Sequence, residues 1–314
     1  MGNWAAPASI ERAAGFSAPA TLFRRRGGED GVRRAPRSAG RDALAPEGAR
    51  YVARALAAGL AEPFDAGDRL IEKLAVRWER ARRRGQLPER RAAAHWERDL
   101  HDMLGARWPC PHADAFAGTW EGVLATMTRS GLRVGRRTYG DQDDADPGLA
   151  RALSCIVHHL SADVVIETGV GHGVSSRVML EALRQSSGGR LYSVDLPPLL
   201  VPDRRVELAA AVPSTLRDRW VLLEGSSRRR LPGLLGGLGQ LDLFVHDSRH
   251  STRNVRWELA SAWPRLRAGG IVVVDDVDVN WGFERFLRGG DDRQPIWCVA
   301  DDGQRQFAIA RKSA

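Results

Sequence analysis

A short β-branched run that ends at an acidic residue and passes into alternating glycines is the feature that most constrains the fold. Residues 164–173 read VVIETGVGHG, and Ser175 and Ser176 follow where a helix is expected to begin. A strand, a tight turn and a helix in this order point backbone N–H groups at the helix N-terminus toward a ligand. Glycines in the turn allow close approach and positive φ. The stretch predicts a ligand-binding turn after the first strand of an α/β sheet.

Beyond this turn the sequence alternates between predicted strands and predicted helices. Strands are expected at residues 190–195, 220–224, 241–246 and 271–274, and helices at residues 178–185, 206–216, 231–238 and 252–266. Because the strands are almost continuously apolar, they are expected to form a parallel sheet that helices cover on both faces. Residues 295–300 and 304–310 flank Asp301-Asp302-Gly303 and predict a closing antiparallel hairpin. The predicted fold class is a Rossmann-like α/β fold.

These patterns divide the chain into three parts. Residues 1–48 are rich in Ala, Arg, Gly and Pro and lack periodicity. They are expected to be disordered, because they would bury too little apolar surface to offset their ordering entropy. Residues 49–134 are predicted to form a helical extension that serves as a lid, an oligomerisation arm or packing. Residues 135–314 are predicted to form the α/β domain.

The helical extension is marked most clearly by a helix that contains Leu70, Leu74 and Trp78 at helical spacing. Asp68 is its expected N-cap, and Gly85 is its expected stop. Further helices are expected at residues 89–104 and 120–127. The extension therefore reads as a set of helices placed before the sheet.

An acidic cluster at residues 141–146 lies near the start of the predicted α/β domain. A calcium-binding EF-hand loop that began at Asp141 would need Gly at its sixth position and Glu at its twelfth, where this chain has Asp146 and Ala152. The cluster is therefore not an EF-hand. Asp146 is instead expected to cap a helix that starts at Pro147 and ends at Leu160.

The composition is typical of a soluble globular protein, with 43% apolar and 27% charged residues. The net charge of +8 suits an anionic partner, but no nucleic-acid-binding motif accompanies it, so solvated arginine-rich helix faces are the preferred interpretation. The three cysteines show no C-x-x-C spacing, so neither a zinc site nor a disulfide framework is indicated. No apolar run approaches the roughly 18 residues of a membrane span. Without an export signal, the chain is predicted to be cytoplasmic.

The E-x-G-x-G-x-G pattern resembles motif I of the class I S-adenosylmethionine (SAM) dependent methyltransferases. A dinucleotide fingerprint differs from it, since it reads G-x-G-x-x-G and places its acid about 20 residues later. The resemblance implies that SAM binds at Glu167, Gly169, Gly171 and Gly173. Asp195 ends the second predicted strand, where its carboxylate can accept the ribose hydroxyl hydrogens of SAM. Ser226, after the third strand, is a candidate adenine contact.

Acidic residues also follow the fourth and fifth predicted strands. Asp247, Asp275 and Asp276 would meet at one sheet edge, and three like charges so close are costly unless a cation shares them. Their hard oxygens suit Mg²⁺ or Mn²⁺. A simpler alternative is that Asp247 only contacts the methionine amino group of SAM.

The pattern Asp247-x-x-His250, with acids 28 and 29 residues after Asp247, resembles the metal-dependent sugar O-methyltransferases of macrolide tailoring, of the macrocin and mycinamicin type. That resemblance implies that Asp247, Asp275 and Asp276 hold Mg²⁺ and that His250 is the general base. The alternative for His250 is a loop histidine that caps the next helix.

The leading functional hypothesis is therefore SAM-dependent O-methylation of a small hydroxylated acceptor, a sugar or another secondary metabolite. The alternatives are a metal-independent small-molecule or nucleic-acid methyltransferase and, ranked lower, an NAD-dependent oxidoreductase. The fourth strand ends without the N/D-P-P-Y/F motif of methyltransferases that modify bases, so nucleic acid is not the expected partner. No membrane partner is expected, and a homo-oligomer is left open.

Overall fold

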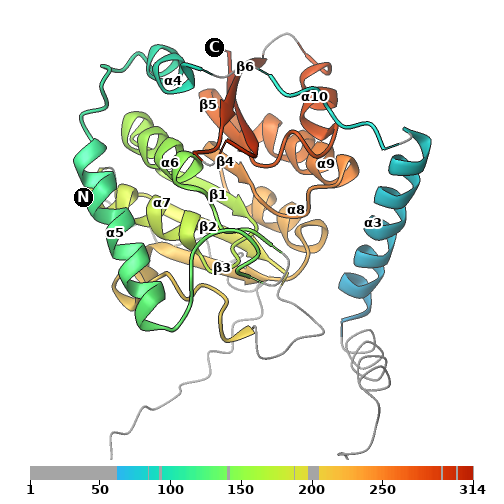
Figure 1. Cartoon of the computed structure of the whole chain (residues 1–314), viewed down its shortest axis with the longest axis horizontal. Helices are drawn as coiled ribbons and strands as arrows, with labels where there is room; N and C mark the ends of the chain where they lie inside the picture. Colours follow the sequence, from blue (N-terminus) through green and yellow to red (C-terminus); the bar gives the residue numbers. More distant parts are fainter. Residues whose placement is uncertain are drawn as a thin grey trace, which may run out of the picture.

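The computed structural model describes residues 62–83, 85–91, 94–139, 142–186, 188–196, 205–290, 293–301 and 303–313. A seven-stranded sheet lies at its centre (Figure 1). Its strands are β1 (Val164–Thr168), β2 (Arg190–Asp195), β3 (Trp220–Glu224), β4 (Leu241–His246), β5 (Leu266–Val274), β6 (Arg293–Val299) and β7 (Gln306–Lys312). The strand order is β3-β2-β1-β4-β5-β7-β6. The predicted strands and the Rossmann-like fold class are confirmed.

The order of the strands decides where a ligand can sit. β1 pairs in parallel with both β2 and β4, so the chain moves outward in opposite directions from β1. A crevice opens at the carboxyl ends of the strands at such a switch point. β7 pairs antiparallel with both β5 and β6, which confirms the closing hairpin. The crevice between β1 and β4 is therefore the expected ligand site.

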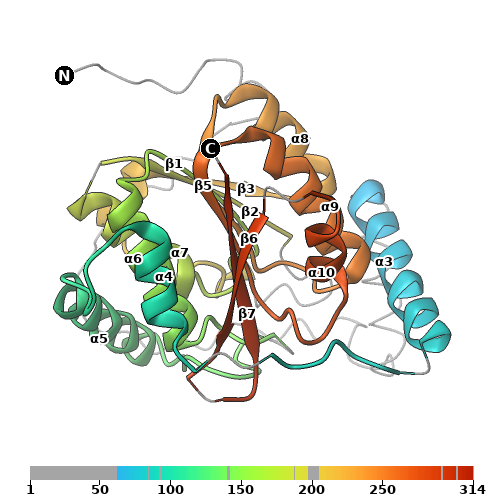
Figure 2. The same ribbon diagram turned by 90° about the horizontal axis from the view of Figure 1, so that it is seen from above.

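Helices cover both faces of the sheet (Figure 2). They are α3 (Pro63–Arg82), α4 (Trp96–Leu104), α5 (Ala113–Arg129), α6 (Pro147–Leu160), α7 (Val174–Gln185), α8 (Ser227–Gly237), α9 (Thr252–Ala262) and α10 (Gly282–Leu287), with short 3-10 segments η3 (Ser214–Arg219) and η4 (Trp263–Arg265). One buried apolar cluster joins α4, α5, α6 and α7 to the sheet, and a second joins α8, α9 and α10 to its other face. No helix in the described part of the chain combines the length and hydropathy needed to cross a bilayer.

Several helix boundaries differ from the prediction. The predicted N-cap Asp68 lies inside α3, which begins at Pro63, and the helix expected at residues 89–104 begins only at Trp96. The expected stop at Gly85 is confirmed by a φ of 77° and by its N–H, which donates to the Arg80 carbonyl at 2.9 Å. Residues 1–48 lie outside the described residues.

At the start of α6 the predicted cap is confirmed. The Asp146 carboxylate accepts hydrogen bonds from the N–H groups of Gly148 at 2.8 Å and Leu149 at 3.1 Å. Pro147 occupies the first turn, where its missing N–H costs nothing.

The prediction of a helix at residues 206–216 is wrong. The described part of this segment forms turns and the start of η3. Its N–H groups bond to the glycine turn instead, with Ala209 donating to Gly171 at 2.9 Å and Ala211 donating to His172 at 2.8 Å. Ala209 adopts a positive φ of 62°, which an α-helix cannot accommodate. These contacts override the helix propensity of the alanine-rich sequence.

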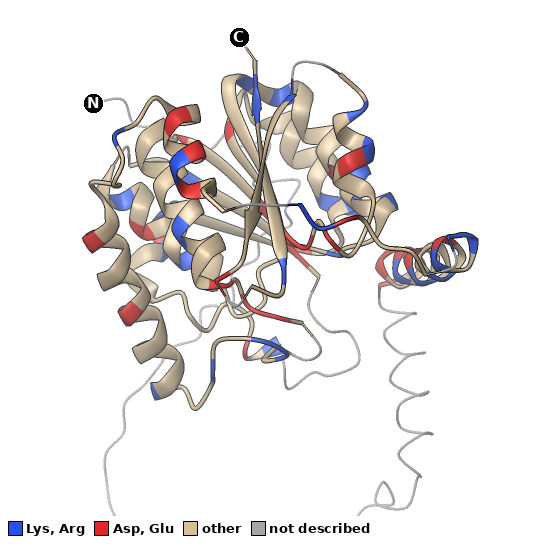
Figure 3. Cartoon of the chain, turned by 45° about the horizontal axis from the view of Figure 1, so that its top comes forward, with Lys and Arg blue, Asp and Glu red and all other residues tan. Residues whose placement is uncertain are grey.

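The faces of α3 are arranged opposite to the usual amphipathic pattern. Its apolar stripe is exposed, with Leu74 56% and Trp78 63% accessible, whereas Asp65 and Glu72 are buried. Asp65 forms an ion pair with Arg229 of α8 at 2.8 Å. Both charge signs line α3 in Figure 3. α3 is therefore attached to the α/β domain by charged contacts.

Candidate active site

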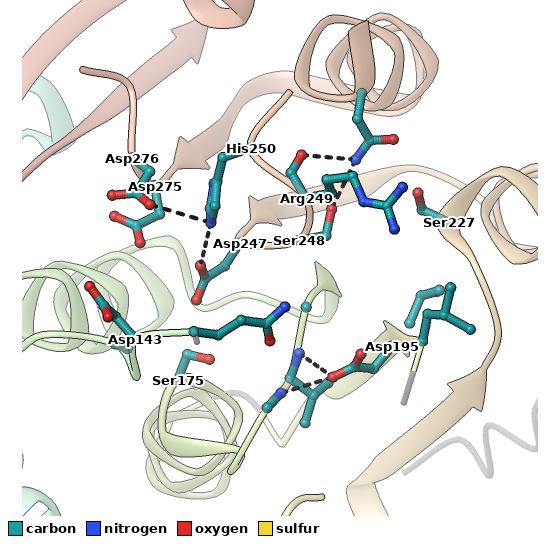
Figure 4. A pocket seen from close by; sticks show the side chains of 18 of the residues that line it. Asp143, Ser175, Asp195, Ser227, Asp247, Ser248, Arg249, His250, Asp275 and Asp276 are labelled. Atoms are coloured by element: carbon teal, nitrogen blue, oxygen red, sulfur yellow. Dashed lines mark hydrogen bonds and ion pairs between the residues drawn. The ribbon is translucent and has the colours of Figure 1, made fainter. Parts of the chain in front are cut away.

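A cavity of about 430 Å³ lies at the carboxyl ends of β1, β2, β4 and β5 (Figure 4). Its wall includes the glycine turn after β1, the ends of β2 and β4, and the first residues after β5. α3 adds Asp68, Arg69 and Glu72 to the wall, and described residues of the segment 136–145 before α6 and of the end of β3 line it as well. The helical extension thus contributes directly to the cavity.

The glycine turn passes close against the end of β4. A Cβ at Gly169 would overlap the carbonyl group of Asp247, and Gly169 has a φ of 89°. Gly171 also has positive φ, but a Cβ there would approach only the Tyr139 ring, at 3.5 Å. Gly169 is therefore required for two independent reasons, close approach and backbone conformation.

The predicted cofactor residues divide into two groups. Four of them line the cavity, where they can contact a ligand: Gly169, Gly171, Asp195 and Ser226. Gly173 lies behind it, where a Cβ would meet Val212 and Ala209. The described wall of the cavity does not include Glu167 either.

Glu167 links the elements that carry the site, although it does not line the cavity itself. Its buried carboxylate accepts hydrogen bonds from Ser175 at 2.5 Å, Ser176 at 2.6 Å and Ser193 at 2.8 Å. These contacts fasten the start of α7 to β1 and β2. Burial raises the pKa of Glu167 to about 7, although the three hydroxyls oppose the shift.

Asp195 has a supporting contact that the sequence did not indicate. Its Oδ2 accepts hydrogen bonds from the N–H groups of Val170 at 2.9 Å and Gly171 at 2.8 Å (Figure 4). Burial raises the Asp195 pKa, and the two backbone donors oppose that rise. The carboxylate therefore braces the glycine turn while it lines the cavity.

Ser226 reaches the cavity from the end of β3. Its N–H donates to Asp65 of α3 at 3.2 Å. Its Oγ is buried and has no hydrogen-bond partner among the described residues. A buried hydroxyl without a partner is costly unless a ligand or water satisfies it.

Asp247, His250 and Asp275 converge at the other half of the cavity. One donor atom from each lies within 4.8 Å of the others. His250 Nε2 is 3.8 Å from Asp247 Oδ1 and 3.5 Å from Asp276 Oδ2 (Figure 4). Asp276 is not part of the cluster of donor atoms; its other oxygen faces Arg305 at 3.4 Å. The residues brought together thus differ from the predicted metal triad by one member.

The carboxylates of this cluster repel one another. Desolvation in the pocket and the neighbouring carboxylates raise the pKa values of Asp247 and Asp275 well above their ordinary range. Desolvation lowers the pKa of His250, which favours a neutral imidazole at physiological pH. Two carboxylates at this separation fit a divalent cation, which would offset their repulsion, and the neutral imidazole beside them is then left to accept a proton.

A buried network that the sequence reasoning missed positions the segment after β4. The Glu258 carboxylate contacts His246 Nδ1 at 2.6 Å and accepts hydrogen bonds from Thr168 at 2.6 Å and Ser248 at 2.9 Å. Burial opposes ionisation of Glu258, but His246, together with the Ser227 and Thr168 hydroxyls, lowers its pKa to about 2. Nothing in the helical pattern of α9 distinguishes Glu258 from a solvated residue, so no sequence signal marked it.

Comparisons with solved structures return several O-methyltransferases. A putative O-methyltransferase from Klebsiella pneumoniae is 19% identical, with 69% of this chain and 96% of that chain covered and a TM-score of 0.48. The Bacillus cereus O-methyltransferase in complex with SAH is 18% identical, with 69% and 96% covered and a TM-score of 0.48. The Streptomyces achromogenes O-methyltransferase TomG, of tomaymycin synthesis, is 20% identical, with 62% and 90% covered and a TM-score of 0.47.

Comparisons with sequences identify the domain that carries the cavity. No curated protein matches the chain. Residues 166–277 match the family described as Methyltransferase domain. This segment runs from β1 to just beyond β5 and contains the glycine turn, Asp195, Asp247 and His250. The match confirms the predicted enzyme class, a methyltransferase.

Proposed function

We propose that this methyltransferase transfers the methyl group of SAM to a hydroxyl of a small acceptor, a sugar or another secondary metabolite. The observation that carries the proposal is the presence of two complementary groups in one cavity. One group is the glycine turn with Asp195, and the other is Asp247, His250 and Asp275.

The cofactor half is supported by donors and acceptors that face the cavity. The N-terminus of α7 and the glycine turn suit the carboxylate of an amino acid, because helix N-termini favour anions. Asp195 supplies a carboxylate for ribose hydroxyls, and the unpaired Ser226 Oγ offers one further polar contact. Bound SAM would supply an electrophilic methyl group.

His250 is assigned as the general base. An aliphatic hydroxyl is a poor nucleophile at neutral pH, and it must lose its proton as it attacks. The neutral His250 imidazole can accept that proton, and Asp276, 3.5 Å from Nε2, stabilises the resulting cation. A positioned base of this kind contributes roughly 10²–10⁴-fold to the rate.

Asp247 and Asp275 are assigned to hold a divalent cation. When bound there, Mg²⁺ would lower the pKa of an acceptor hydroxyl. Asp276, which the sequence placed in the metal triad, is assigned here to orient His250, because its carboxylate lies between His250 and Arg305.

The base assignment is tested with SAM, Mg²⁺ and a panel of hydroxylated acceptors, with SAH release as the readout. His250→Ala is expected to lower kcat by roughly 10²–10⁴-fold while SAH affinity stays nearly unchanged. The matched control is His95→Ala, because His95 is exposed and lies outside the cavity. An unchanged kcat in His250→Ala would remove the base assignment.

The cation assignment has a separate test with the same assay. Asp247→Asn is expected to abolish stimulation by Mg²⁺ and to leave most of the SAH affinity. Wild-type activity that persists undiminished in EDTA would contradict the role of the cation, but it would leave the methyltransferase assignment standing.

A further inference from the structure

A second group of metal-binding side chains lies apart from the active-site cavity. It consists of His101 from α4, Cys110 from the segment between α4 and α5, and Cys155 and His159 from α6. None of the four lines the active-site cavity. α4 lies beside α6, on the face of the sheet that also carries α5 and α7 (Figure 2). The group therefore calls for a role independent of methyl transfer.

The donor atoms of this group have the separations of a tetrahedral metal site. Cys110 Sγ lies 3.9 Å from Cys155 Sγ and 3.7 Å from His159 Nε2. Cys155 Sγ lies 3.5 Å from His101 Nε2, and all four donor atoms fall within 4.8 Å of one another. Zn–S bonds of about 2.3 Å and Zn–N bonds of about 2.0–2.1 Å at tetrahedral angles place two sulfurs about 3.8 Å apart and S–N pairs about 3.5 Å apart.

The protein also orients these ligands. His101 Nδ1 lies 2.6 Å from the Glu97 carbonyl, and since a carbonyl only accepts, Nδ1 carries the proton and Nε2 is free to bind a metal. Cys155 and His159 are four residues apart, so they project from the same face of α6. His101 and Cys155 are buried, and Cys110 and His159 are half-buried.

We propose that His101, Cys110, Cys155 and His159 bind one zinc ion as a structural site. Two thiolates balance the charge of Zn²⁺, which makes a half-buried site electrically neutral. Four protein ligands leave no open position for substrate, as is typical of structural rather than catalytic zinc. The ion would clamp α4 and the α4–α5 segment to α6, and so join the helical extension to the α/β domain.

A disulfide between Cys110 and Cys155 is the competing interpretation. A disulfide requires an S–S bond of about 2.05 Å and has no need of nitrogen ligands. Here one imidazole nitrogen approaches each sulfur, His159 at Cys110 and His101 at Cys155. This arrangement of two sulfurs and two nitrogens favours the metal.

The first test is the zinc content of the full-length protein, purified without a histidine tag and without chelators. About one zinc per chain is expected, and Cys110→Ser and Cys155→Ser should each lose most of it. Cys298→Ser is the matched control, because Cys298 is a buried cysteine in β6 outside the group, and it should keep its zinc. Zinc that is retained in the Cys110→Ser/Cys155→Ser double variant would overturn the proposal.

The second test is made on the wild-type protein, so its main result does not depend on the folding of a cysteine variant. Cobalt added to the metal-free wild-type protein is expected to give the visible bands of tetrahedral Co²⁺ together with a near-ultraviolet thiolate charge-transfer band. Asp247→Asn should keep that band, which separates this site from the carboxylate cluster of the active site. A wild-type protein without the thiolate band, or with a Cys110–Cys155 disulfide and no zinc as isolated, would overturn the proposal.

Discussion

At the scale of single residues, Glu167 shows that a motif residue can serve a site without lining it. The acid that precedes the glycines suggested a cofactor contact, yet its carboxylate is occupied by Ser175, Ser176 and Ser193. Its pairing fixes the start of α7 relative to β1. We infer that Glu167 acts on the cofactor through the position of that helix.

Glu167 should also make stability depend on pH. An unfolded glutamate ionises near pH 4.3, whereas burial raises the pKa of Glu167 in the folded protein to about 7. Between these values the unfolded chain releases a proton that the folded protein keeps, so stability falls as pH rises. The loss is on the order of 3 kcal/mol and is complete above about pH 7.

Glu167→Gln removes this titration. Urea unfolding of both proteins at about pH 4.5, near the lower end of this window, and at about pH 8, above it, should show the variant gaining stability relative to the wild type at the higher pH. Glu121→Gln, which neutralises an exposed glutamate, is the control and should track the wild type. A constant difference between Glu167→Gln and wild type at both pH values would contradict the buried titration.

At the scale of single elements, α3 shows that hydrophobic periodicity can identify a helix without deciding which of its faces is buried. Spacing of Leu70, Leu74 and Trp78 identified a helix, and a helix is present, but its buried residues are Asp65 and Glu72. Glu72 accepts hydrogen bonds from Ser251 and Arg253 at the start of α9, next to His250. The charged face of α3 thus supports one wall of the active site.

Replacing the buried carboxylate should therefore loosen α3. Glu72→Gln replaces a buried carboxylate that pairs with Arg253 and Arg228. Arg253 is 38% exposed and both arginines also face Asp68, so the expected loss is about 1.5–3 kcal/mol. Amide hydrogen exchange of α3 is expected to accelerate at least about tenfold. Leu74→Ala, on the exposed apolar stripe, is the control and should leave exchange nearly unchanged. The reverse pattern would show that the apolar face holds the helix.

The elements differ in how far the sequence predicts them. The apolar strands and the acids at their ends were predictable, because a buried parallel strand is marked by its composition and its end is marked by Asp195 or Asp247. The turns at residues 205–213 were not, because their N–H groups bond to Gly171 and His172, a contact that no local pattern encodes. His101 and Cys110 come close to Cys155 and His159 because α4 packs against α6. The spacing of these four residues along the sequence matches no metal-binding motif, so the sequence did not mark them.

At the scale of the whole molecule, the cavity lies where its separate parts meet. One apolar cluster lies on each face of the sheet, and α3 is joined to the domain by Asp65, Arg69 and Glu72. A cofactor that fills the cavity would contact the sheet edge and α3 at once. Binding to the folded protein alone must then stabilise the assembly as a whole.

This linkage gives a test that separates the SAM assignment from an NAD-dependent alternative. A ligand at 100 times its Kd stabilises a protein by about 2.7 kcal/mol, and each kcal/mol shifts the Tm of a domain this size by about 2–4 °C. SAH is therefore expected to raise the Tm by about 5–10 °C, and NADH should leave it unchanged.

Asp195→Ala should lose most of the SAH shift, because it removes both a cavity carboxylate and the brace on the Val170 and Gly171 N–H groups. The Tm of this variant without ligand serves as its own reference, so lost binding is distinguished from lost folding. Stabilisation by NADH but not by SAH would overturn the cofactor assignment and the proposed methyl transfer, while the zinc site would stand, since its ligands lie outside the cavity.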